Sequence, residues 1–144
     1  MIKMNREEME KFKELNVVVK NVRRTVRKLM KEHLNEVNHN QSRRELELEL
    51  FYKQIGFISK KWIIEILWEL EIHQGLNFNE FMRHLKGISS RSLSDRLKTL
   101  KKINLITRTV QDTSPPKVLY ELNDKGKGLV ELSVPIIWHL FSYR

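Results

Sequence analysis

The sequence of 144 residues contains no cysteine, five glycines and three prolines, and no long apolar run. The absence of cysteine excludes a disulfide scaffold. No run approaches the ~18 consecutive apolar residues that indicate a transmembrane helix. The first six residues also lack the apolar stretch of a secretory signal. We therefore expect a cytoplasmic protein with no membrane partner, and the 40% of hydrophobic residues suffices for a core.

Residues for enzymatic chemistry are also scarce. No glycine-rich phosphate loop is present, and the serines of residues 89–94 form no nucleophile elbow. The histidines include no pair at the i, i+4 spacing of helical metal ligands, so we expect surface or interface positions for His33, His39, His73, His84 and His139. We predict no enzyme activity, no cofactor and no metal site, and no residue set specifies an effector pocket.

Positive charge is present in excess and is unevenly distributed. The chain has 27 Lys and Arg against 18 Asp and Glu, a net charge of +9. Residues 86–117 alone contain eight Lys or Arg and only two Asp. Such a concentration of positive charge on one segment is typical of phosphate binding.

The same segment has the local signals of two consecutive helices. Asn77 or Asn79 can cap the first helix, with Glu80 placed for a capping box, and Gly87 is expected to end it. Ser89 can cap the second helix.

The second helix is predicted to be apolar on one side and polar on the other. Its leucines recur at i, i+4 and i+7, which predicts one buried stripe formed by Leu93, Leu97 and Leu100. The opposite side carries Arg91, Asp95, Lys98 and Lys102, with Ser92 and Ser94 at the flanks. Such a helix can enter a DNA major groove, although a solvated amphipathic helix has the same pattern.

A β-hairpin is predicted directly after this helix. Residues 105–111 are rich in β-branched side chains, residues 112–116 are turn formers, and residues 117–122 return as a second strand. Asn123 can then cap a last helix beginning at Asp124. Two helices followed by a basic hairpin make a winged helix-turn-helix.

Several ordered motifs resemble one known family. The motifs are Lys61–Leu70, Phe78–Phe81, Gly87–Ser89, Leu93–Leu100 and Tyr120–Gly126. Over about residues 50–141 the chain is similar to the HxlR-type winged helix-turn-helix regulators. The resemblance implies a dimeric DNA-binding transcription regulator, with a recognition helix at about 89–102 and a wing at about 110–118. Many members carry a cysteine before the first helix, and some use it as a sensor. Thiol-based sensing is excluded here.

About fifty residues precede the region of resemblance. Within them apolar residues alternate three- and four-residue steps over about two and a half heptads, namely Phe12, Leu15, Val19, Val22, Val26 and Leu29. We expect this helix to pack across a dimer, with packing inside one subunit or a free arm as alternatives. Its residues 20–31 contain six Lys or Arg and no acid, either as a solvated face or as a contact for phosphates or an acidic partner.

Two further segments need an interpretation. Residues 38–44 are expected to connect the two parts, and residues 45–51 alternate like a strand but consist of helix formers, so we predict a helix. In the last helix, Pro135 should cause a kink or a split. The resemblance favours a dimer seam for the apolar residues that follow, Ile136, Ile137, Trp138, Leu140 and Phe141.

Together these patterns predict a mostly α protein with a small β-hairpin. Residues 1–44 would form a helical dimerisation extension, and residues 45–144 a winged helix-turn-helix domain ending in a dimerisation helix. We expect a homodimer that binds a palindromic duplex. The candidate DNA contacts are Ser89, Ser90, Arg91, Ser92, Ser94, Asp95, Lys98, Lys101, Lys102, Arg108 and Lys117. A non-specific architectural DNA binder and a protein-docking module of the transcription machinery are the alternatives.

Overall fold

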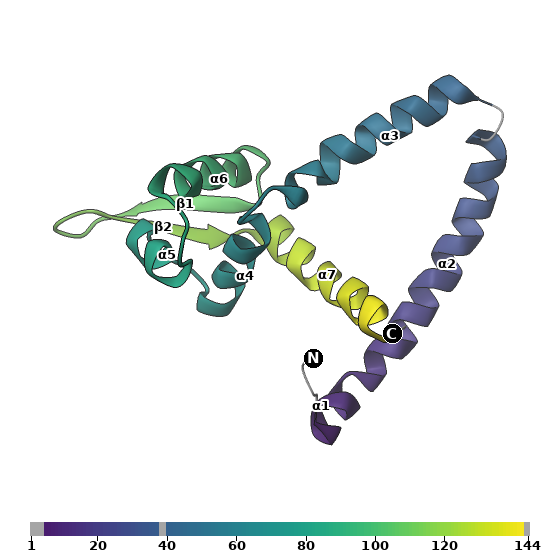
Figure 1. Cartoon of the computed structure of the whole chain (residues 1–144), viewed down its shortest axis with the longest axis horizontal. Coiled ribbons are helices and arrows are strands. Elements are labelled where there is room, and N and C mark those ends of the chain that lie inside the picture. The colour runs from purple at the N-terminus through teal and green to yellow at the C-terminus, as the bar shows by residue number, and fades with distance from the viewer. Residues whose placement is uncertain (1–4, 38–39, 143–144) are drawn as a thin grey trace. The chain divides into compact units, whose positions relative to one another are not determined.

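The computed structural model describes residues 5–37 and 40–142, which are mostly helical with one antiparallel hairpin, as predicted (Figure 1). They form two compact units, one comprising Lys53–Glu131 and the other the described residues up to Tyr52 together with those from Leu132 onward. The elements in chain order are α1 (Arg6–Lys11), α2 (Lys13–Val37), α3 (Gln41–Ile55), the short 3-10 helix η1 (Gly56–Ser59), α4 (Ile63–His73), α5 (Phe78–His84), α6 (Ser90–Lys102), β1 (Ile106–Gln111), β2 (Lys117–Leu122) and α7 (Asp124–Ser142).

The unit Lys53–Glu131 contains all of the buried apolar side chains among the described residues. The most completely enclosed are Phe81 from α5, Ile63 and Ile66 from α4, and Leu93 and Leu100 from α6. They meet in one cluster, which Leu105, Ile106 and Leu122 of the hairpin region and Val130 of α7 extend. The winged helix therefore has a continuous core of its own.

Three polar residues start α5, α6 and α7 as the sequence predicted. The Asn77 side chain accepts a hydrogen bond from the Glu80 backbone N–H at 2.9 Å, and Glu80 accepts one from the Asn77 N–H at 2.7 Å, which completes a capping box. Ser89 Oγ accepts from the Ser92 N–H at 3.1 Å. Asn123 Oδ1 accepts from the Gly126 N–H at 3.0 Å. These bonds satisfy N–H groups that have no partner inside their own helices.

The predicted hairpin is confirmed, with strands that pair from Ile106 opposite Leu122 to Gln111 opposite Lys117. Its turn lies at the end that points away from the helices α4, α5 and α6 (Figure 1). At the base, Leu76 adds a short bridge to Tyr120 through two backbone hydrogen bonds of 2.9 and 3.0 Å. The hairpin is thus fixed to the segment between α4 and α5.

The start of α7 lies very close to the entry into the hairpin. A Cβ atom on Gly126 would lie 2.1 Å from the carbonyl oxygen of Leu105 and 3.0 Å from a methyl of Leu122. The Asn123 N–H also bonds the same Leu105 oxygen at 3.1 Å. Gly126 is therefore required by space.

One sequence prediction about a helix end was wrong. The first helix of the pair ends at His84 with Leu85 as its C-cap, and Gly87 instead has φ of +93° within the following turn. The helix α7 is continuous through Pro135, so the predicted split does not occur and a kink stays a prediction. A proline removes only one backbone donor, and its carbonyl partner four residues earlier belongs to the exposed Glu131, where solvent can take its place.

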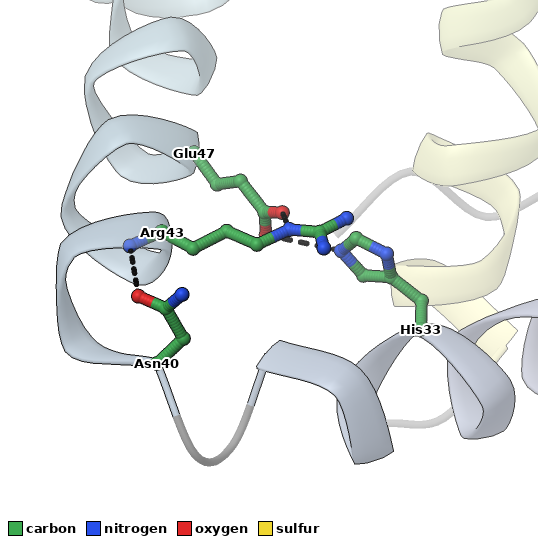
Figure 2. A network of polar contacts seen from close by, with 4 residues as sticks. All are labelled: His33, Asn40, Arg43 and Glu47. Atoms are coloured by element: carbon green, nitrogen blue, oxygen red, sulfur yellow. Dashed lines mark hydrogen bonds and ion pairs between the residues drawn. The ribbon is translucent and has the colours of Figure 1, made fainter.

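The other unit contains α1, α2, α3 and the end of α7, and the structure begins α3 earlier than the predicted connection allowed. The Asn40 side chain accepts from the Arg43 N–H at 3.0 Å, so α3 starts at Gln41 (Figure 2). The Glu47 carboxylate joins α3 to α2 by a 3.0 Å contact with His33 Nε2, and it also accepts from Arg43 at 3.3 Å. The hydrogen bond with His33 and, to a smaller extent, the one with Arg43 lower the pKa of Glu47.

Aromatic contacts connect the two chain ends of this unit. The rings of Phe12 and Trp138 stack at 5.1 Å, and Trp138 Nε1 donates to Asn16 Oδ1 at 2.9 Å. The described helices include none with both the length and the apolar character that a membrane span requires.

Candidate nucleic-acid interface

The helix α6 divides into a buried and an exposed side, as its sequence predicted. Leu93, Leu97 and Leu100 are at most 3% exposed and fix the helix to the core. Arg91, Asp95, Lys98 and Lys102 are exposed, and Ser92 and Ser94 at the flanks are half-buried. The core therefore holds one polar, basic helix side toward solvent.

The exposed cations of this region have no acidic partner within the part of the chain that the structure describes. This holds for Arg91, Lys98, Lys101, Lys102, Arg108 and Lys117. Their positive charge is therefore not neutralised locally and remains available to an anionic ligand. The N-terminal end of α6 adds the partial positive charge of a helix terminus beside Ser90 and Arg91.

The serines differ in whether their hydroxyl groups already form hydrogen bonds within the helix cap. Ser89 Oγ accepts from the Ser92 N–H and donates to Ser92 Oγ at 2.9 Å, so the helix cap occupies it. Ser90 is exposed at the first position of α6, where a hydroxyl and a free backbone N–H are both accessible. Among the predicted serine contacts, Ser90 is thus the exposed one that takes no part in the cap.

One arginine of residues 86–117 makes a contact inside the protein. The charge count of this segment did not distinguish it from the cations that face solvent. Arg96 is half-buried, and its Nε donates to the carbonyl oxygen of Lys61 at 2.9 Å. Lys61 and Trp62 lie at the start of α4, where Trp62 has φ of +77°. Arg96 therefore ties α6 to this turn.

The wing presents its cations along the hairpin. Arg108 lies in the middle of β1 opposite Tyr120, and Lys117 begins β2 opposite Gln111, directly after the turn. Inside the turn, Thr113 Oγ1 donates to the Pro115 carbonyl at 2.9 Å. Arg108 and Lys117 are both exposed, so α6 and the hairpin offer two basic elements on one unit.

The predicted dimer residues differ in exposure within the single chain. Phe12, Leu15, Val19 and Trp138 are half-buried in their own unit, where Phe12 and Trp138 stack on each other. The others are at least 42% exposed, namely Val22, Val26, Leu29, Ile136, Ile137, Leu140 and Phe141. Large apolar side chains exposed in such a number mark an interaction surface.

An open groove on α2 combines some of these apolar residues with cations of residues 20–31. Its apolar lining comes from Val22, Val26, Met30 and Leu34, and its cations are Arg23, Arg27 and Lys31. Half of the six cations in residues 20–31 therefore lie beside the apolar seam.

One cluster in the winged helix was missed by the sequence analysis. Glu69 and His73 of α4 meet His84 of α5, and one ligand atom from each residue lies within 4.8 Å of the others. The only sequence signal was the i, i+4 spacing of Glu69 and His73, because His84 reaches them through the packing of α5 on α4.

Comparison with known proteins places this geometry in a family. Residues 57–141 match the model of the HxlR-like helix-turn-helix. The regulatory protein named MalR of Fusobacterium mortiferum is 38% identical over 78 residues, which are 54% of this chain and 74% of MalR. The HTH-type transcriptional regulator YvaP of Bacillus subtilis is 34% identical over 82 residues, covering 57% and 75% of the two chains.

A solved structure agrees with these relatives. The reduced form of the transcriptional regulator YodB from B. subtilis superposes with a TM-score of 0.55 at 27% identity, over 58% of this chain and 81% of YodB. The family match covers more than half of the chain and includes α4 to α6, the hairpin and most of α7. The chain therefore belongs to the HxlR-like helix-turn-helix family.

Proposed function

We propose that this protein is a sequence-specific DNA-binding transcription regulator that inserts α6 into a major groove and rests its hairpin on the phosphate backbone. The observation that carries the proposal is the exposed side of α6, where Arg91 and Lys98 have no acidic partner among the described residues while the leucine stripe behind them is buried. Membership of a helix-turn-helix family and the regulator names of its relatives support it.

Different residues would supply specificity and affinity. Arg91, near the N-terminal end of α6, has the reach and the paired donors that recognise a guanine edge. Ser90, Ser94 and Asp95 would lie near bases, with Asp95 orienting Arg91 or Lys98. Ser89 and Ser92, which bond each other in the cap, would add phosphate contacts through that turn. The cations beyond the recognition surface would mainly bind phosphates, namely Lys101, Lys102, Arg108 and Lys117.

The active form in this proposal is a homodimer in the cytoplasm. Its interface would use the exposed apolar residues of the N-terminal extension and of the end of α7, which lack cover in the single chain. A two-fold dimer places two α6 helices on the two halves of a palindrome, with half-sites about 34 Å apart. Residues 1–44 would then serve as the dimerisation extension.

The test is a binding selection from a random duplex library, followed by fluorescence anisotropy on the selected and a scrambled duplex over a range of salt concentrations. We expect a palindrome that binds at least ~10³-fold more tightly than the scramble. Equal and steeply salt-dependent binding to both duplexes would replace this proposal by non-specific architectural binding. Absence of binding at physiological salt would favour the protein-docking module.

A further inference from the structure

The cluster of Glu69, His73 and His84 has a composition that DNA binding does not require. Glu69 and His73 lie one turn apart on α4, and His84 is the last residue of α5. Glu69 Oε2 lies 2.9 Å from His84 Nδ1 and 3.2 Å from His73 Nε2, and the two imidazole rings are 4.6 Å apart. Two imidazoles therefore converge on one carboxylate oxygen.

We propose that this cluster is a binding site for a divalent transition-metal ion of the zinc type. Two imidazole nitrogens and one carboxylate oxygen are a donor set that such ions prefer. Zinc–ligand bonds of about 2.0–2.1 Å in a tetrahedron place neighbouring ligand atoms roughly 3.3 Å apart. The two nitrogen–oxygen distances, 2.9 and 3.2 Å, are already close to that edge.

The surroundings allow an ion to enter and leave one coordination position open. The side chains of His73 and His84 are 42% and 32% exposed, and that of Glu69 is 22% exposed. Three protein ligands leave a fourth position for water or another donor. The backbone on both sides is fixed, because α4 and α5 pack through the buried core that contains Leu70 and Phe81.

A bound ion would join two helices next to the turn of the helix-turn-helix. His84 directly precedes the segment 85–89 that leads into α6. The ion would bridge the end of α4 and the end of α5, where the side chains of Glu69 and His84 already meet. Binding should therefore raise the melting temperature of this unit, because a ligand that binds only the folded state stabilises it.

A second histidine–carboxylate contact in the chain provides a matched control. His33 meets Glu47 at 3.0 Å, but the third member of that network is Arg43, a cation that does not bind metal ions (Figure 2). His33→Gln removes one exposed imidazole from a histidine–glutamate pair and leaves the proposed site intact.

The experiment is calorimetric titration of Zn²⁺ into the full chain, without a polyhistidine tag and after treatment with a chelator. We expect one ion per chain and a loss of affinity of at least about tenfold in His73→Gln and in His84→Gln, since even outer-shell changes cost 10–100-fold. His33→Gln should bind as the unchanged chain does, and circular dichroism checks that all variants fold. No binding, or equal affinity in all variants, would overturn the proposal.

NMR of the unchanged chain gives a second test that does not depend on variants. Zn²⁺ should shift the ring nitrogen signals of His73 at Nε2 and of His84 at Nδ1, the atoms that face Glu69. Shifts confined to other histidines would contradict the assignment.

Co²⁺ in place of Zn²⁺ should give the visible absorption of a four-coordinate ion, which the His84→Gln variant should lose.

Discussion

The two units of the chain differ in the burial of their apolar side chains. In Lys53–Glu131 fifteen large hydrophobic side chains are buried and only a few, such as Trp68, remain exposed. In the unit of α1, α2, α3 and the end of α7, none of the described side chains is buried, and apolar residues such as Leu29 at 60% and Leu140 at 65% face solvent.

This difference indicates which unit buries its apolar side chains within one chain and which unit leaves them exposed. The winged helix folds around its own core, which holds α6 in place within one chain. The helical unit exposes many large apolar side chains, which is typical of an interaction surface. We therefore propose that the first unit contacts DNA and that the second unit mediates association.

The same substitution in the two units should give the largest contrast. Leu70 on α4 is 1% exposed, and Leu70→Ala should lower the free energy of unfolding by about 2–5 kcal/mol because it leaves a cavity. Leu29→Ala on α2 should change it by no more than about 0.5 kcal/mol at protein concentrations too low for dimers. Urea unfolding measures both, and equal losses would erase the distinction between the units.

A substitution where α7 contacts the hairpin entry should lower the free energy of unfolding nearly as much as a substitution in the core. Gly126→Ala would place a methyl group 2.1 Å from a backbone oxygen, so the helix start must shift. We expect a loss near the upper end of the 1–3 kcal/mol typical of overpacking. Gly128→Ala is the control, because its added Cβ meets nothing within 4 Å. A Gly126→Ala protein as stable as the control would show that the close approach is relaxed in solution.

A charge in the α2 seam should weaken association without unfolding the winged helix. Val26→Asp places a carboxylate on the apolar groove, and we expect a rise in the dimer dissociation constant of roughly 30-fold, as for a hot-spot residue. Thr25→Asp adds the same charge at the exposed neighbouring position. Sedimentation velocity distinguishes the two, and a monomeric unchanged chain or an unaffected Val26→Asp dimer would remove α2 from the interface.

The smallest effect should concern the contact between α2 and α3. The pKa of Glu47 is lowered first by His33 and then by Arg43, so the contact stabilises the fold at pH values above the usual carboxylate range. That contribution is lost as pH falls below 4.5 and the carboxylate takes up a proton. In a pH titration by NMR, His33→Gln should raise the Glu47 midpoint more than Arg43→Gln does. Identical midpoints in all three proteins would show that the contact does not form.

Local signals made much of the winged helix predictable from sequence. The caps at Asn77, Ser89 and Asn123 act within three residues, and the leucine stripe of α6 depends only on helical periodicity. The strands were likewise predicted from β-branched residues, and their turn from the prolines.

The features that escaped prediction depend on residues far apart in the chain. His84 meets Glu69 across 15 residues, Arg96 meets the Lys61 carbonyl across 35, and Trp138 meets Asn16 across 122. Periodicity describes which side of one helix is apolar, but it does not specify which helix that side meets. The DNA contacts and the dimer residues stay predictions for the same reason, since both require a second molecule.

In the proposed mode of binding, α6 reads the sequence while the wing binds the backbone, and three variants separate these two roles. Arg91→Ala, Lys117→Ala and the control Lys127→Ala would be titrated against selected and scrambled duplexes over a series of salt concentrations. We predict that Arg91→Ala loses about 1–3 kcal/mol on the selected duplex and little on the scramble, whereas Lys117→Ala weakens both alike and lowers the salt slope by about one. Selectivity and salt slope unchanged from the Lys127→Ala control in both variants would contradict these roles of α6 and the wing.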